Sequence, residues 1–333
     1  MTIVARVATS QTSAAQFALD VQYYLAQQPR QLPSRYFYDA LGSALFDAIC
    51  QLPWYRITRA ELRLLAAHGR DIWRRRPARP FDTIVELGGG TGEKLVTLLQ
   101  TRTDAGPSTG AGAHLDVHLI DVSGSALAAS ARALSGLEDV HIVTHQAPYE
   151  IGLAEAGVRR SIGGGTLVLF LGSNIGNFDP PGAEAFLVGI RSALTRGDAF
   201  LLGADLVKPA RALLLAYDDP LGVTAAFNRN LLVRINRELG GDFDVDGFSH
   251  RACWNEEASR VEMHLVSRRR QRVRVPSAQL ELDFEEGESI WTESSYKYRL
   301  EGIVRMLERS GFRLAEQWSD RDDGFALTLV EAV

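Results

Sequence analysis

The sequence is poor in cysteine, with only Cys50 and Cys253 in 333 residues. The two lie far apart and neither belongs to a Cys-x-x-Cys pair, so the sequence offers neither a disulfide framework nor a cysteine zinc motif. Such low cysteine usage is typical of a reducing compartment. We therefore expect a cytoplasmic protein that binds no metal.

Long apolar runs are also lacking. The longest, Leu167–Gly172 and Ala199–Ala204, have the length of strands, whereas a membrane span needs about 20 residues. The segment before Asp20 has no continuous apolar stretch like that of a secretory signal, although its lack of acidic residues leaves a transit peptide as an alternative. We expect no membrane partner.

A basic excess is absent as well. The chain has 36 Lys and Arg against 41 Asp and Glu, a formal net charge of −5. Because nucleic-acid-binding domains usually carry a basic excess, we expect neither DNA nor RNA as a partner. The basic run RRRQRVR at residues 268–274 is interpreted as a solvated strand face rather than a phosphate-binding patch.

Short apolar runs that alternate with helical patterns indicate the fold. Such runs stand at residues 83–87, 115–121, 140–144, 166–172 and 199–204. This alternation predicts a parallel sheet with helices on both faces. A helix at 300–309 and two last strands, 312–318 and 325–330, follow; the strands' short link SDRDDG requires an antiparallel pair. Between about 206 and 297 the alternation stops, and two helices and several strands, among them 260–267, are expected instead.

A glycine-rich segment, VELGGGTGEK at residues 85–94, follows the first of these strands. Glycines there let the backbone approach a ligand closely at the start of a helix. The segment matches neither a Walker A loop nor a full GxGxxG motif. Asp121, at the end of the second strand, can accept hydrogen bonds from both ribose hydroxyls of a nucleoside cofactor. Together these features allow S-adenosylmethionine (SAM) or NAD, and the terminal hairpin favours SAM.

Three polar residues near the predicted sheet edge each have two interpretations. Asn174 and Asn177, in FLGSNIGNF at residues 170–178, are either turn formers or hydrogen-bond partners of a substrate amine. Lys94 stands just inside a helix N-terminus, where the helix dipole disfavours a cation. It is either a solvated surface residue or the partner of a cofactor carboxylate.

Five stretches carry a more specific signal: LPSRYFYDALGSALFDAICQLPWY, VELGGGTGEK, FLGSNIGNF, AYDDPLGVTAAFNRN and WTESSYKY. Together they resemble the histidine-specific Nα-methyltransferases of ergothioneine biosynthesis, over about residues 32–330. The resemblance implies transfer of three methyl groups from SAM to the α-amino group of L-histidine, giving hercynine. We therefore expect a monomeric enzyme whose partner is its small-molecule substrate, L-histidine.

The resemblance also implies an architecture. It is an α/β fold with a Rossmann-like class I methyltransferase sheet and a C-terminal antiparallel hairpin, joined to a second α+β substrate domain. We expect the SAM-binding domain at residues 61–207 and 298–333, and the substrate-binding domain at residues 1–60 and 208–297.

The family's functional residues can be placed by motif. SAM is expected against Gly88, Lys94 and Asp121, with Tyr149 covering the adenine ring by stacking. The substrate pocket is expected at Tyr38, Tyr55, Asn177, Tyr217, Met263, Glu293 and Ser295. Asn177, Tyr217 and Tyr55 are the expected catalytic residues. Asn177 holds the reacting amine, Tyr217 binds the substrate carboxylate, and Tyr55 closes over the substrate. Glu293 and Ser295, two residues apart on one strand face, bind the imidazole.

The chain departs from the family pattern at two places. Pro148 replaces the Asp that would accept a hydrogen bond from the adenine amino group, which bears on cofactor affinity rather than on cofactor identity. Arg56 and Ile57 follow Tyr55 in place of an aromatic residue and a proline, which can alter the mouth of the pocket. Two alternatives therefore stay open: methylation of another small amino acid or amine, and a non-catalytic ligand-binding homologue.

Overall fold

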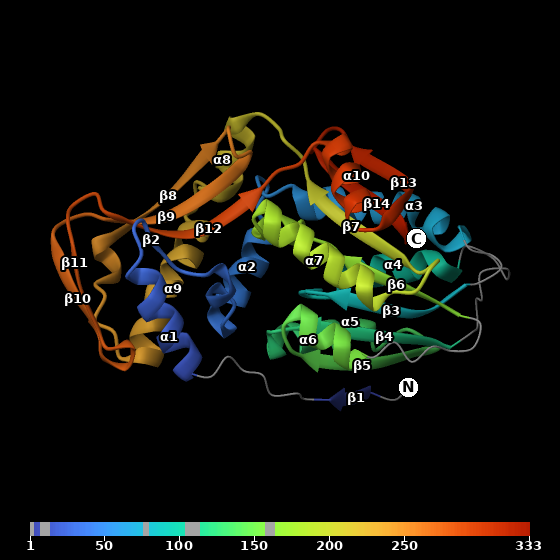
Figure 1. Ribbon diagram of the computed structural model, residues 1–333, viewed down its shortest axis with the longest axis horizontal. Helices are drawn as coiled ribbons and strands as arrows, with labels where there is room; N and C mark the ends of the chain where they lie inside the picture. Colours follow the sequence, from blue (N-terminus) through green and yellow to red (C-terminus); the bar gives the residue numbers. More distant parts are fainter. Residues whose placement is uncertain (1–2, 7–13, 76–79, 104–113, 157–163) are drawn as a thin grey trace. The chain divides into compact units, whose positions relative to one another are not determined.

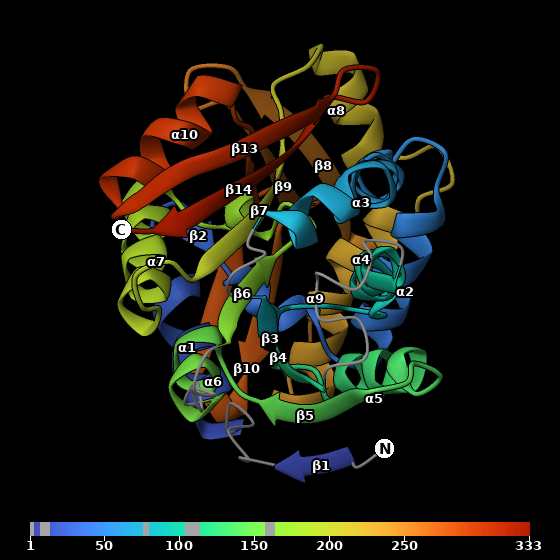
Figure 2. The same cartoon turned by 90° about the vertical axis from the view of Figure 1, so that its right-hand side faces the viewer.

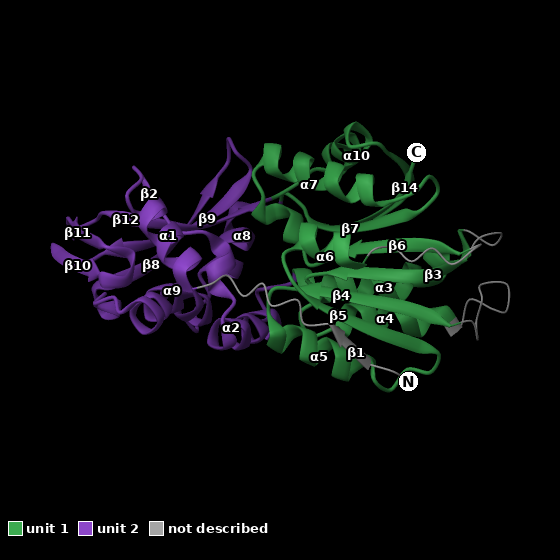
Figure 3. Ribbon diagram, turned by 60° about the horizontal axis from the view of Figure 1, so that its bottom comes forward, with its two compact units in different colours: residues 1–11, 57–207, 297–333 green, residues 12–56, 208–296 purple. Residues whose placement is uncertain are grey.

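The computed structural model describes residues 3–6, 14–75, 80–103, 114–156 and 164–333. The chain divides into two compact units, coloured separately in Figure 3. Unit 1 comprises residues 1–11, 57–207 and 297–333, and unit 2 comprises residues 12–56 and 208–296.

Unit 1 is built on an eight-stranded sheet with the strand order β1-β5-β4-β3-β6-β7-β14-β13. Its strands are β1 (Ile3–Arg6), β3 (Phe81–Leu87), β4 (Leu115–Asp121), β5 (Val140–Gln146), β6 (Gly165–Phe170), β7 (Ala199–Asp205), β13 (Phe312–Asp320) and β14 (Phe325–Ala332). The first six strands pair in parallel, whereas β14 runs antiparallel to both β7 and β13. This arrangement confirms the predicted Rossmann-like sheet and its C-terminal hairpin.

Helices cover both faces of this sheet, with α3, α4 and α5 on one side and α6, α7 and α10 on the other (Figure 2). They are α3 (Ile57–Arg74), α4 (Glu93–Thr103), α5 (Gly124–Leu134), α6 (Tyr149–Ala156), α7 (Pro180–Ala193) and α10 (Leu300–Arg309). The central strands β6 and β7 are buried at every residue, as their continuous apolar sequences require in a sheet covered on two faces.

Unit 2 combines helices with a small sheet (Figure 1). Its helices are α1 (Ala14–Leu25), α2 (Ala40–Gln51), α8 (Ala210–Tyr217) and α9 (Val223–Leu239), with the 3₁₀ turn η1 (Ser34–Phe37). Its four-stranded sheet has the order β2-β12-β9-β8: β2 (Arg30–Gln31), β8 (Phe248–Asn255), β9 (Arg260–Ser267) and β12 (Ser289–Tyr296). A separate antiparallel pair is formed by β10 (Gln271–Val275) and β11 (Leu280–Phe284).

The larger segment of unit 2, residues 208–296, leaves and re-enters unit 1 at two points that are neighbours in space. Leu206 and Tyr298 form a β-bridge, and the Tyr298 amide donates to the Asp205 carbonyl at 2.9 Å. Beside it, the buried Lys297 ammonium lies 3.1 Å from the buried Asp205 carboxylate. The β-bridge and the ion pair thus hold together, within unit 1, the two points where the chain passes to unit 2 and back.

The unit boundaries differ from those expected from the sequence at the N-terminal side. The sequence predicts residues 1–60 in the substrate domain, whereas Ile3–Arg6 pairs in parallel with β5 and unit 1 resumes at Ile57. A four-residue edge strand is held by main-chain hydrogen bonds and leaves no periodic side-chain pattern, so the sequence gives no sign of it. In the part of the chain that is described, no helix is long and apolar enough to cross a membrane.

Candidate functional site

The glycine-rich turn after β3 lies at the carboxyl edge of the parallel sheet of unit 1. Gly88 has a φ of +68°, and its amide donates to the Ile120 carbonyl at 2.8 Å. A Cβ at Gly88 would lie 2.6 Å from the Tyr149 hydroxyl and 3.1 Å from the Asn174 amide nitrogen. Only glycine therefore lets the backbone pass between these side chains, which is the close approach that a bound ligand requires.

Asp121 ends the neighbouring strand β4 at the same edge. Its carboxylate accepts a hydrogen bond from the Ser123 amide at 2.8 Å. Burial raises the pKa of Asp121 to about 6, although hydrogen bonds from the backbone amides of Ser123, Gly90 and Val122 act in the opposite direction. An acceptor of this kind, desolvated and ionised near neutral pH, is suited to bind hydroxyl donors.

Glu86 is a second buried carboxylate at this turn, which sequence analysis did not single out. It is 1% exposed, and neither carboxylate oxygen has a hydrogen-bond partner among the described residues. A Cβ on Gly89 would lie 2.3 Å from Glu86 Oε2, so the carboxylate sits directly against the glycine turn. Burial raises the pKa of Glu86 to about 7, while the nearby Lys94 acts to lower it. The sequence signal for it is an acid inside the short apolar run 84–87, directly before the glycine turn.

Lys94, in the first turn of α4, forms an ion pair inside unit 1. Its ammonium lies 2.7 Å from Glu61 Oε2 on α3, and its side chain is 21% exposed. Glu61 is fully buried, and both of its carboxylate oxygens accept from the Gly172 amide, at 3.0 and 2.9 Å. Lys94 is therefore held at the sheet edge, and Glu61 is a further residue that sequence analysis did not name.

The segment after β6 turns sharply before it reaches Asn177. Gly172 and Ser173 have positive φ values of +77° and +60°, and the Ser173 hydroxyl accepts from the Asp205 amide at 2.9 Å. A 3₁₀ turn, η3 (Asn174–Asn177), follows. Asn174 lies against Gly88, whereas the side chain of Asn177 is exposed at the end of η3. The predicted strand 166–172 thus ends two residues early because its last residues form this turn.

In unit 2, aromatic rings from the helices α2, α8 and α9 and from two connecting segments form a continuous cluster. Ring centroids are separated by 5.7 Å between Tyr38 and Phe46, 6.2 Å between Phe46 and Tyr55, and 6.4 Å between Tyr55 and Tyr217. The ring of Phe227 on α9 also contacts the rings of Tyr38 and Phe46. Burial, followed by the charges of Tyr217 and other neighbours, raises the pKa of Tyr55 well above its usual value. The Tyr55 hydroxyl therefore stays protonated and can donate.

Polar groups of unit 2 converge beside this cluster. The Tyr217 hydroxyl, at the end of α8, donates to the Ser295 hydroxyl of β12 at 2.7 Å, and both residues are buried. Glu293 pairs with the buried Met263 across β12 and β9, and Ser295 follows two residues later in regular register. Glu293 and Ser295 thus share a strand face. The charge of Glu293 also contributes to raising the pKa of Tyr55.

Residues 17–332 match the family model described as histidine-specific methyltransferase, SAM-dependent. The chain belongs to this family. It is 41% identical over 317 residues to the histidine N-alpha-methyltransferase of Mycolicibacterium smegmatis and 42% identical over 312 residues to that of Mycobacterium tuberculosis, with 93% of each chain covered in both comparisons. It is also 27% identical over 278 residues to ergothioneine biosynthesis protein 1 of Neurospora crassa, covering 79% of this chain and 31% of that protein.

In this histidine-specific methyltransferase the predicted residues fall into two groups. Unit 1 carries Gly88, Lys94, Asp121, Tyr149 and Asn177, and unit 2 carries Tyr38, Tyr55, Tyr217, Met263, Glu293 and Ser295. Pro148 precedes α6, and its carbonyl accepts from the Gly152 amide at 2.9 Å. Tyr149 packs against Phe170 and Phe186 at 5.4 and 5.7 Å, so its ring is held in place.

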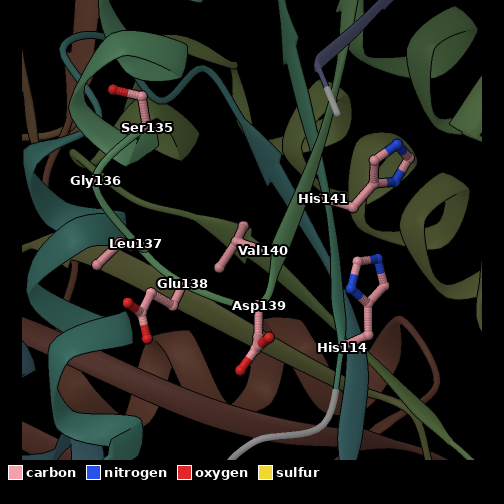
Figure 4. A pocket seen from close by; sticks show the side chains of 8 residues that line it. All are labelled: His114, Ser135, Gly136, Leu137, Glu138, Asp139, Val140 and His141. Carbon is pink, nitrogen blue, oxygen red and sulfur yellow. The ribbon is translucent and has the colours of Figure 1, made fainter. Parts of the chain in front are cut away.

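Other candidate ligand sites of this methyltransferase contain none of the predicted residues. A pocket stands where β4 and β5 begin, at the opposite end of these strands from Asp121 (Figure 4). Its lining residues are His114, Ser135, Gly136, Leu137, Glu138, Asp139, Val140 and His141. Two groups within the described residues have metal-ligand chemistry, namely His114, Asp116 and His141, and Cys253, Glu262 and His264. Neither group includes a predicted site residue.

Proposed function

We propose that the protein transfers methyl groups from SAM to the α-amino group of L-histidine, three times in succession, to give hercynine. The observation that carries the proposal is the buried Tyr217–Ser295 hydroxyl pair, on the same strand face as Glu293 and beside the aromatic cluster. A small substrate with a polar ring needs this combination of apolar walls and a few directed polar groups.

The sheet edge of unit 1 has the chemistry to hold SAM. Glu86 offers a buried carboxylate with no partner among the described residues, suited to an ammonium group, and Asp121 offers an acceptor for ribose hydroxyls. Lys94 supplies a cation for the methionyl carboxylate, and Tyr149 an aromatic surface for the adenine. SAM itself supplies an activated methyl group on a sulfonium.

The polar groups of unit 2 suit histidine. Glu293 can accept from an imidazole N–H, while Ser295 uses its own O–H or a lone pair on the ring. The single O–H of Tyr217 would turn from Ser295 to donate to the substrate carboxylate, and the protonated Tyr55 would close over the substrate. The exposed amide of Asn177 would hold the reacting amine.

The protein's main contribution to the reaction is orientation. An α-amino group has a reference pKa near 8, so a neutral fraction exists at mildly alkaline pH without a dedicated base. Holding this amine in line with the methyl donor lowers the entropic part of the barrier. Each transfer leaves a cationic product, and the rings of Tyr38, Phe46 and Tyr55 can stabilise it by cation–π contact.

We further propose that the enzyme acts in the cytoplasm as a monomer without a metal, and that its product enters ergothioneine biosynthesis. Two cysteines and a net charge of −5 support a cytoplasmic protein with no nucleic-acid partner. The likeness to an ergothioneine biosynthesis protein supports the pathway.

Mass spectrometry of histidine incubated with the protein and SAM tests the proposal. We expect products with one, two and three added methyl groups, the last accumulating, and much slower methylation of other amino acids in a parallel panel. Preference for another amino acid would favour the alternative that the enzyme methylates a different small amino acid or amine. Binding of SAM without methylation of any amine would favour a non-catalytic homologue.

Replacing Tyr217 with Phe removes the hydroxyl bonded to Ser295 while the ring remains. We expect the KM for histidine to rise about tenfold or more, because a bond to a charged group is lost, with the Kd for SAM unchanged. The matched control is Tyr296→Phe, since Tyr296 is equally buried on the opposite face of β12, where its hydroxyl accepts from Arg260 at 2.7 Å. Steady-state kinetics give the KM for histidine of both variants, and so compare the two faces of β12. Equal KM values for the variants would contradict the assignment.

A further inference from the structure

Glu61 is a fully buried carboxylate that the reaction as described above does not use. It stands on α3 among apolar residues, and the fold leaves space for it with glycines. A Cβ on Gly203 would lie 1.9 Å from Glu61 Oε1, and a Cβ on Gly172 would lie 2.8 Å from the Lys94 ammonium. The local structure is therefore arranged around this carboxylate and its partner.

The contacts of Glu61 join two parts of unit 1. Its carboxylate accepts from the Gly172 amide at 3.0 and 2.9 Å and lies 2.7 Å from the Lys94 ammonium. Gly172 opens the turn that leads through η3 to Asn177, and its φ of +77° is a conformation that glycine adopts without strain. A buried ion pair contributes little net stability, because desolvation of both charges offsets their attraction.

We propose that Glu61 is a positioning residue that couples cofactor binding at Lys94 to the turn Gly172–Asn177, which carries the amine-binding Asn177. The inference rests on the proposed roles of Lys94 and Asn177. A lysine ammonium has three donors on a flexible chain. Glu61 engages one donor and thereby directs the others, while its hold on the Gly172 amide fixes the start of the turn.

The variant Glu61→Gln separates charge from shape. Its amide oxygen can still accept from the Gly172 amide, but it no longer neutralises or directs Lys94. We expect the Kd for S-adenosylhomocysteine, measured by calorimetry, to rise about tenfold, as for loss of a charge-assisted contact. In a Lys94→Met background the same substitution should change this Kd by less than about twofold, because Glu61 then has no lysine to direct.

The matched control is Asp198→Asn. Asp198 is also buried in unit 1 and accepts hydrogen bonds from the amides of Thr166 and Thr195, at 3.1 and 2.8 Å. We expect this variant to lose thermal stability while it binds S-adenosylhomocysteine with the wild-type Kd. A general effect of removing a buried carboxylate would instead weaken binding in both variants.

Hydrogen–deuterium exchange tests the coupling without altering Glu61. In the wild type, S-adenosylhomocysteine should protect a peptide spanning residues 170–178 from exchange, and Lys94→Met should abolish this protection at a ligand concentration that still saturates the variant. If Glu61→Gln does not fold, this exchange experiment still tests the coupling between Lys94 and the turn Gly172–Asn177.

The proposal is overturned if Glu61→Gln binds with the wild-type Kd, if its effect adds fully to that of Lys94→Met, or if protection of residues 170–178 does not depend on Lys94. Binding of S-adenosylhomocysteine requires no methyl transfer. A wild type that shows the coupling but methylates no histidine would therefore contradict the proposed function and leave the coupling intact.

Discussion

Replacing Glu293 with Ala is expected to raise the KM for histidine about 100-fold while the Kd for SAM stays within about twofold of the wild type. The imidazole N–H would lose a charged acceptor, and a site built to bond a polar group loses most when that bond is missing. Glu293 stands on β12 of unit 2, whereas the residues proposed to hold SAM belong to unit 1.

Steady-state kinetics and calorimetry measure the two quantities separately. The control is Glu281→Ala, because Glu281 is an exposed carboxylate of unit 2 whose ion pair with Arg272, at 3.3 Å, lies on the surface. Glu293→Gln, which keeps an acceptor oxygen without the charge, should recover part of the affinity for histidine. Equal losses of histidine and SAM binding in Glu293→Ala would contradict the assignment to the imidazole.

Replacing Glu86 with Gln is expected to weaken SAM binding at pH 8 by about 10- to 100-fold, through loss of the carboxylate proposed to meet the SAM ammonium. The wild type should also lose affinity as the pH falls below about 7. There Glu86, whose pKa burial raises to about 7, takes up a proton and no longer carries the charge. The loss should approach tenfold per pH unit for this one group.

Calorimetry between about pH 8 and pH 6 checks this pH dependence, which should be nearly flat in Glu86→Gln. Below about pH 6 a second loss of affinity is expected in both proteins, because the pKa of Asp121 is raised to about 6. A wild-type affinity that does not change between pH 8 and pH 6 would contradict the role given to Glu86.

In the absence of ligand, the Glu86→Gln variant should have a larger free energy of unfolding than the wild type. Because the pKa of Glu86 is raised on folding, the folded state holds its proton longer than the unfolded state, and stability falls as the pH rises from about 4.5 to about 7. Glu86→Gln removes this cost, a gain of about 1–3 kcal/mol at pH 8 that vanishes near pH 4.5. Chemical denaturation at both pH values measures it, and a gain that is equal at both would have another cause.

Much of the fold could be predicted because its strands and helices carry strong local patterns. The predicted helix 300–309 and strand 260–267 have the same bounds as α10 and β9. The first has a clearly amphipathic sequence, and the second alternates buried and half-buried residues along its length. The edge strand β1 escaped prediction because main-chain pairing with β5 defines it.

Site residues whose roles depend on packing between distant parts of the chain could not be predicted from the sequence. Glu61 and Gly172 are 111 positions apart in the chain, and only the packing of α3 on the sheet brings the carboxylate to that amide. For Lys94 the sequence left a solvated residue or a cofactor contact, and the structure adds a protein partner that neither interpretation included. Motif resemblance named the residues proposed to touch ligands, but not those that hold them in position.

The fastening of Leu206 to Tyr298 has an evolutionary consequence. Since residues 208–296 depart and return at neighbouring points secured by a β-bridge and the Lys297–Asp205 pair, this stretch can vary in length and content with little strain on the parent sheet. Natural selection can therefore remodel the module proposed to bind the amine substrate, while the sheet proposed to bind SAM is inherited unchanged. Because unit 2 also includes residues 12–56, a graft of the corresponding module from a related enzyme at this junction would have to carry that segment as well.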